Sequence, residues 1–196
     1  MKKVFKVLLS AFIFMGIFGL TNTTIYASTP TWPNGARFTR GVGNTCFWIS
    51  SSAAPYAANI RSAANNWVHT GWDNPIYMTE VSSNYATHMD MYAKTSSQDS
   101  VLASTVAAYV SFWDSNGKLL APKGNGPKVN YFYTEITINK NGFPSAYRTR
   151  IMIHEMGHAF GLAHSSSKKS IMYPFYNAVE VSTVQKVDND TINLLY

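Results

Sequence analysis

Residues 154–164 read HEMGHAFGLAH, and no other stretch of the chain says as much about the fold. His154 and His158 are four residues apart, so on a helix their imidazoles lie on one face, one turn apart. That separation suits a single Zn²⁺ ion, which binds imidazole nitrogens in a tetrahedral site. Gly161 can take a positive φ, which ends the helix and turns the chain back. His164 is then placed to give the ion a third nitrogen.

Three histidine ligands predict a catalytic zinc site rather than a structural one, because the fourth coordination position stays open for water. Glu155 is next to the first ligand on the same helix, where its carboxylate can take a proton from that water. The sequence therefore predicts a hydrolase. Its metal ligands are His154, His158 and His164, and its general base is Glu155.

The whole segment resembles the extended zinc-binding motif of the metzincin proteases. That family places a methionine on a tight turn beneath the zinc, and Met172 stands eight residues after His164 in the run SIMYP, residues 170–174. Ser165, this spacing and the residues around Tyr176 are similar to the matrixins, the matrix metalloproteinase family, and to its bacterial secreted relatives. The resemblance implies a zinc-dependent endopeptidase.

The same resemblance implies the architecture and the substrate-binding residues. The fold would be α+β: an N-terminal twisted mixed sheet with two long helices, one of them the active-site helix, then a Met-turn and a short C-terminal subdomain with a closing helix. Pro174 and Tyr176 would form the outer wall of the pocket for the side chain after the scissile bond. Residues 101–105, including Leu102 and Ala103, would form the edge strand that pairs with an extended substrate. An ordinary sheet strand is the alternative for that run.

Residue patterns along the chain predict the order of elements. Helical spacing of apolar residues predicts helices, and alternating or short apolar runs predict strands. The strands are expected at 47–50, 76–81, 87–92, 105–113 and 128–139, and the helices at 55–68, 144–160 and 182–196. Asn116 and Gly117 predict a tight hairpin turn between the last two strands. This order is typical of an α+β domain.

The first 27 residues have the pattern of a secretory signal peptide. Three lysines precede an apolar run over residues 7–20, and Ala27 supplies a small residue for cleavage. The run is shorter than the roughly 20 residues that cross a bilayer. We therefore expect cleavage after Ala27, a secreted extracellular protein, and no stable membrane association afterwards. A retained anchor is the alternative.

Cleavage would leave residues 28–45 as an irregular lead-in rich in Pro and Gly, and residues 46–196 as one catalytic domain. Three of the 16 Lys and Arg residues belong to the first segment, so the remainder carries 13 against 10 Asp and Glu. These basic residues are scattered, which argues against nucleic-acid binding. We expect a monomer that acts on protein or peptide substrates. Cys46 is the only cysteine, so no internal disulfide forms, and it is expected in the core.

Two other functions remain open at this point. In a gluzincin protease the third ligand would be a glutamate, and Glu180 lies 22 residues beyond His158. The other is a secreted carbohydrate- or protein-binding module with an inactive or ancillary zinc site, because the 12 Tyr and 5 Trp residues can form stacking platforms. Aromatic residues in an exported domain of this size are more often part of the core.

Other polar residues have simpler explanations than metal binding. His88 and Asp90 are two apart on a predicted strand and therefore share one face, where we expect a hydrogen-bonded pair rather than ligands. Asp114 and Asn116 offer oxygens for Ca²⁺, but a tight turn requires the same residue types. Calcium binding is therefore not supported by a clear site.

Overall fold

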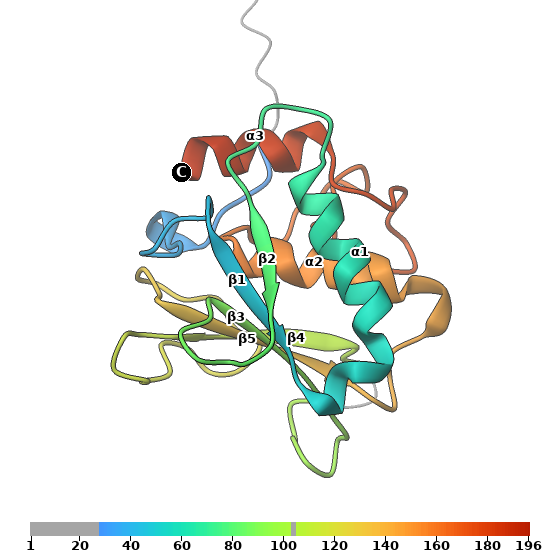
Figure 1. Ribbon diagram of the computed structural model, residues 1–196. Coiled ribbons are helices and arrows are strands. Elements are labelled where there is room, and N and C mark those ends of the chain that lie inside the picture. The colour runs from blue at the N-terminus through green and yellow to red at the C-terminus, as the bar shows by residue number, and fades with distance from the viewer. Residues whose placement is uncertain (1–27, 103–104) are drawn as a thin grey trace, which may run out of the picture.

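The computed structural model of the protein describes residues 28–102 and 105–196 (Figure 1). The predicted signal peptide, residues 1–27, lies outside the described residues. The helices and strands are β1 Thr45–Ile49, α1 Ala57–Val68, β2 Met78–Val81, β3 Met89–Lys94, β4 Ala108–Trp113, β5 Tyr133–Asn139, α2 Arg148–Ala159 and α3 Lys186–Leu195. Short 3-10 turns η1 Pro33–Gly35, η2 Ser51–Tyr56 and η3 Ser145–Tyr147 precede β1, α1 and α2.

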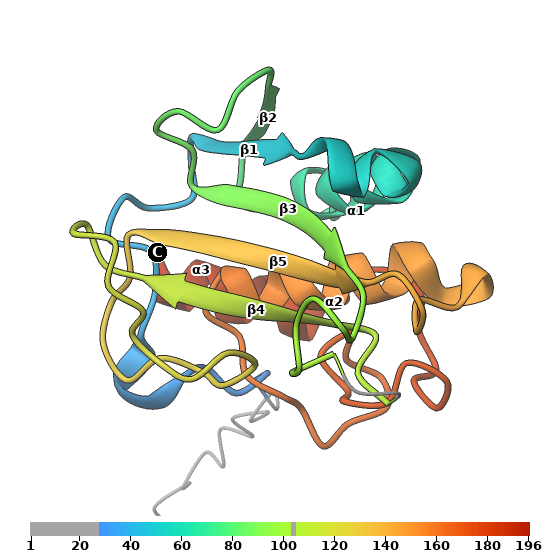
Figure 2. The same ribbon diagram turned by 90° about the horizontal axis from the view of Figure 1, so that it is seen from below.

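The five strands form one mixed sheet in the order β2-β1-β3-β5-β4. All neighbours are parallel except β4, which runs antiparallel to β5 at one edge. Figure 2 shows the twist of the sheet, with α2 and α3 behind β4 and β5. The predicted α+β fold with a mixed sheet is therefore confirmed.

The core lies between the sheet and the helices α1 and α2. Alternate strand residues point toward it, as a pleated strand requires. Large side chains from both layers are fully buried there, among them Trp67, Met89, Met91, Phe112, Ile136, Ile138 and Met152. Each contributes roughly 1.5–3 kcal/mol through burial. The indole N–H of Trp67 donates to the carbonyl of Ile153 at 2.8 Å, which fixes α1 against α2.

The closing helix α3 begins four residues later than the pattern predicts. Gln185 is its N-cap, and Asp188 completes a capping box with the N–H of Gln185. The preceding residues 182–184 are therefore outside the helix. Within residues 28–102 and 105–196, no helix has the length and apolar character of a membrane span.

The predicted tight turn forms, but it does not join two paired strands directly. Gly117 has a φ of +74°, and Asp114 Oδ1 accepts the N–H of Asn116 at 2.8 Å. The chain then runs through a long loop, residues 118–132, before it enters β5. Asn116 and Gly117 therefore determine the conformation of the turn only. The pairing of β4 with β5 is set by the apolar faces of the two strands.

The prediction that Cys46 lies in the core is wrong, because its side chain is partly exposed. Cys46 and Phe47 are neighbours on β1, so their side chains point to opposite faces of the sheet. Phe47 is 3% exposed and takes the core side. Cys46 consequently lies on the outer face.

His88 and Asp90 are both buried and hydrogen-bonded, as expected for a structural pair. The Nδ1 atom of His88 accepts the N–H of Cys46 at 3.1 Å, and the hydroxyl of Thr87 donates to Asp90 at 2.6 Å. Burial, with a smaller effect of Arg40, lowers the pKa of His88 to about 4. In the folded protein this ring is therefore neutral at pH values above about 4.

We expect the variant His88→Asn to lose part of the acid sensitivity of the fold. In the unfolded chain the imidazole takes up a proton near its ordinary pKa of about 6.5, whereas in the folded chain it does so near 4. Stability therefore falls as the pH decreases through this window, by up to about 3 kcal/mol. Asn offers an acceptor for the N–H of Cys46 but does not titrate in this range.

Urea unfolding of the metal-free proteins at pH 7 and pH 4.5 measures the effect. Wild type should lose more free energy of unfolding between the two pH values than the variant does. An equal loss in both proteins would contradict the assignment.

Candidate metal centre

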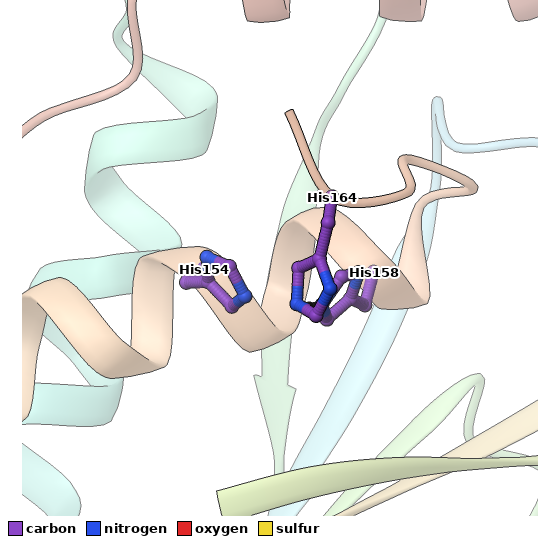
Figure 3. A group of neighbouring side chains, drawn as sticks. All are labelled: His154, His158 and His164. Carbon is purple, nitrogen blue, oxygen red and sulfur yellow. Dashed lines mark hydrogen bonds between the residues drawn. The ribbon is translucent and has the colours of Figure 1, made fainter. Parts of the chain in front are cut away.

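Three histidine side chains converge at the end of α2. His154 and His158 are one turn apart on the helix, and His164 approaches them from the loop that follows (Figure 3). One nitrogen from each ring lies within 4.8 Å of the other two, and the Nε2 atoms of His158 and His164 are 3.2 Å apart. The three predicted ligands are thus brought together as the spacing of the sequence requires.

Backbone carbonyls fix the tautomers of the two helical histidines. The Nδ1 atom of His154 lies 2.8 Å from the carbonyl oxygen of Ile171, and that of His158 lies 2.7 Å from the carbonyl of Leu162. A carbonyl only accepts hydrogen bonds, so each Nδ1 carries the hydrogen and each Nε2 keeps a free lone pair. This is the arrangement in which imidazole binds a metal. The residues therefore fit a zinc ion.

The charge state of the site also suits a metal. Burial lowers the pKa of His154 to about 4, and burial with repulsion from its neighbours lowers the pKa of His158 well below its ordinary value. Both rings are neutral at pH 7, which metal binding requires. Glu155 is 7% exposed, and burial raises its pKa to about 8. A cation held by the imidazoles would favour its charged form.

The turn that returns His164 is a Schellman motif at the end of α2. Gly161 has a φ of +105°, and its N–H donates to the carbonyl of His158 at 3.0 Å. The N–H of Leu162 donates to the carbonyl of Gly157, also at 3.0 Å. These two bonds satisfy carbonyls that the helix end leaves free. The predicted stop at Gly161 is confirmed.

Aromatic side chains supply further donors to this helix end. The carbonyls of His158, Ala159 and Phe160 accept hydrogen bonds from Trp32 Nε1 at 3.0 Å, Tyr131 Oη at 2.7 Å and Tyr196 Oη at 3.1 Å, respectively. The three donors come from segments far apart in the sequence. They hold the last turn of α2, which carries His158, from three sides.

Met172 lies directly against α2. It is fully buried, and a Cβ atom built on Gly157 would lie 2.4 Å from its Sδ atom, so the sulfur packs on the bare glycine backbone. The N–H of Ser165 donates to the carbonyl of Met172 at 2.9 Å. The methionine is therefore beneath the turn of α2 that bears His158.

The histidines open into a cleft of about 620 Å³. Glu155 and His164 line it together with Pro174 and Tyr176, the two residues expected to form the substrate pocket. Arg150 lines the same cleft and donates from Nη1 to the carbonyl of Tyr176 at 3.0 Å. Arg150 could not be predicted from the sequence, because it precedes the zinc motif in an ordinary helical position.

The predicted strand at residues 101–105 does not form at Leu102. Leu102 is fully buried and lies in a turn, where its N–H donates to the carbonyl of Asp99 at 3.1 Å. Ala103 lies outside the described residues. Of the two edge strands of the sheet, β4 is the one at the cleft, and its first residue Ala108 lines the cleft together with Ala107. The alternating pattern thus marks a strand, but one that starts later than residues 101–105.

Comparison with known proteins shows which family this part of the chain resembles. The family model described as Matrixin matches residues 137–196, which hold the three histidines, Glu155 and Met172. Over this segment the chain resembles the matrixins. This confirms the resemblance seen in the zinc motif and the Met-turn.

Three relatives show the same likeness over shorter segments. Macrophage metalloelastase of Rattus norvegicus is 42% identical over 92 residues, and that of Oryctolagus cuniculus is 30% identical over 77 residues. These segments are 43% and 38% of this chain, and 20% and 17% of the relatives. A protein of Trichoplusia ni ascovirus 2c described as a matrix metalloproteinase is 65% identical over 26 residues, 13% of this chain and 5% of its own length. The likeness thus spans a fifth or less of these relatives.

A buried carboxylate joins the outer parts of the matrixin-like site. Asp188 on α3 accepts four hydrogen bonds: from the hydroxyls of Thr29 and Ser170 at 2.6 and 2.5 Å, and from the N–H groups of Ile171 and Gln185, both at 3.1 Å. It thereby connects the N-terminal segment, the loop that carries Met172, and α3. A buried charge of this kind is tolerated only when its oxygens are fully hydrogen-bonded.

We expect Asp188→Asn to destabilise the matrixin-like domain by roughly 3 kcal/mol. The NH₂ group of the new amide would face hydroxyl and N–H groups that are themselves donors, so hydrogen bonds of the carboxylate would be lost. The matched control is Asp190→Asn on the same helix. Asp190 is partly exposed and paired with Lys186 at 2.7 Å, so its loss should cost no more than about 0.5 kcal/mol. Urea unfolding of the metal-free variants compares them, and similar losses in both would argue against this role of Asp188.

Proposed function

We propose that this chain is a secreted zinc endopeptidase that hydrolyses protein or peptide substrates. The observation that carries the proposal is the group of three converging histidines, two of them with a free Nε2, of which His154 and His164 line the same cleft as the buried carboxylate of Glu155. The matrixin family match supports the same chemistry. Two of the relatives are named macrophage metalloelastase, which is consistent with protein hydrolysis by a metal enzyme.

In this proposal His154, His158 and His164 would hold the ion through their Nε2 atoms. When bound, zinc supplies a Lewis acid that polarises the scissile carbonyl and acidifies the attacking water. The carboxylate of Glu155 takes a proton from that water and then delivers it to the nitrogen of the leaving amine. Met172 supports the helix turn that bears His158, so its role is to keep the ligand set in place.

We infer that the start of β4 binds an extended substrate. The loop that follows β4 covers its far end, where the N–H of Leu120 donates to the carbonyl of Phe112 at 2.9 Å. The edge next to the cleft, at Ala108, is therefore the part that can pair with a peptide backbone. Pro174 and Tyr176 would then contact the side chain after the scissile bond.

The proposal includes export of the protein as a monomer. The lysines and the apolar run of residues 1–27 support a signal peptide with cleavage after Ala27. Residues 28–45 would remain as the lead-in to a catalytic domain over residues 46–196. This lead-in is anchored at the metal centre, since the carbonyl of Pro30 accepts the N–H of Ala163 at 2.7 Å.

The structure disfavours the two alternatives. Glu180, the third ligand of a gluzincin, is exposed and outside the histidine group. Its backbone N–H donates to the carbonyl of Lys168 at 2.9 Å, in a surface loop. A sugar-binding surface would need exposed aromatic platforms beside the metal centre. Trp67 and Tyr131 are fully buried in the core, and the exposed rings of Trp72, Tyr77 and Tyr85 do not line the histidine cleft.

We expect Glu155→Gln to lower kcat for peptide hydrolysis by about 10²–10⁴-fold, because the amide cannot accept the proton of the attacking water. Zinc content should stay at one ion per chain, since the three histidines are unchanged. Turnover of a quenched protein substrate and metal analysis of the same preparation measure both quantities.

Glu180→Gln is the matched control, because it removes a nearby exposed carboxylate with the same chemical change. Its activity should equal that of wild type, and chelation should abolish activity in both until zinc is restored. Chelator-resistant hydrolysis, or full activity of Glu155→Gln, would sink the proposal. Loss of zinc from Glu180→Gln would instead favour the gluzincin ligand set.

A further inference from the structure

The indole ring of Trp32 lies on the imidazole of His158. The two ring centroids are 5.0 Å apart and the planes are inclined by 27°, which is a stacked arrangement. The Nε1–H group of Trp32 donates to the carbonyl oxygen of His158 at 3.0 Å. One side chain therefore holds both the ring and the backbone of a predicted zinc ligand, from a position 126 residues earlier in the chain.

Trp32 is itself held in place by two other segments. Its backbone N–H donates to the carbonyl of Gly161 at 3.0 Å, and its ring meets the edge of Phe112 at a centroid distance of 5.8 Å. A Cβ atom built on Gly126 would lie 2.1 Å from the indole, so the backbone of the loop before β5 lies directly against it. The indole is thus confined between His158 and this loop.

The remaining contacts of the imidazole show what the indole adds. Leu162 fixes Nδ1 of His158, and the rings of His154 and His164 meet it edge-on at centroid distances of 4.6 and 4.7 Å. None of these contacts lies parallel to the ring. The stacked indole therefore opposes tilting of the imidazole plane, and it does so before any metal binds.

We propose that Trp32 is a positioning residue that preorganises His158 for zinc. This inference rests on the proposed function, because it concerns the same ligand set. Aromatic stacking and a hydrogen bond to the ligand residue each favour one geometry, and a preorganised ligand loses less freedom when it binds. The lead-in of the domain consequently belongs to the metal centre, although it contributes no ligand.

Metal affinity of four variants tests the proposal. Trp32→Ala removes the stacking and the hydrogen bond, and should weaken zinc binding about tenfold. Trp32→Phe keeps an aromatic face without the N–H and should recover part of the loss. Gly126→Ala displaces the indole although neither Trp32 nor any zinc ligand is substituted. It should weaken zinc binding about three- to tenfold. Gly43→Ala, where an added Cβ meets ordinary contacts 3.6 Å away, should stay within about twofold of wild type.

The readouts are the zinc dissociation constant against a competing chelator and the visible absorption spectrum of the Co²⁺-loaded protein. A merely structural Trp32 would lower the free energy of unfolding of the metal-free and zinc-loaded forms equally and leave the Co²⁺ spectrum unchanged. That result, or wild-type affinity in both Trp32→Ala and Gly126→Ala, would overturn the inference. If Trp32→Ala does not fold, Gly126→Ala decides alone. Failure of the proposed function is distinct, because wild type and Gly43→Ala would then bind no zinc or cleave no substrate.

Discussion

Gly161 must adopt a left-handed backbone for the three histidines to meet, and the rest of the site depends on that single reversal. Its φ of +105° ends α2 and lets the chain return within three residues to His164. A side chain there would be strained, and its Cβ would also lie 3.1 Å from the carbonyl of Ala36. The same turn leaves the carbonyl of Leu162 free to hold His158. Ligand geometry is therefore set by backbone conformation.

Segments from both ends of the described chain then hold this turn in place. Trp32 and Tyr196 donate to carbonyls of the last turn of α2, and Asp188 ties Thr29 to the loop before Met172. The carbonyl of Ile171 in that loop fixes the ring of His154. The site is thus surrounded by hydrogen bonds that satisfy buried polar groups and hold the three imidazoles close together.

Local chemistry made much of this predictable. The spacing of His154 and His158 follows from helical geometry, and the stop at Gly161 follows from the conformational freedom of glycine. The mixed sheet also followed from the strand patterns and the family resemblance. Trp32 and Asp188 could not be found in this way, because their contacts connect residues 126 and 159 positions apart and leave no local pattern. The start of the edge strand was misplaced for a related reason. Alternation marks a strand but not where its pairing with β5 begins, and that start is at Ala108.

Zinc K-edge X-ray absorption of the purified protein counts the ligands of the bound ion and therefore tests the three-histidine site itself. We expect three imidazole nitrogens at about 2.0–2.1 Å and one further light ligand from water. A sulfur ligand from Cys46, a protein carboxylate in place of His164, or only two imidazoles would contradict this ligand set.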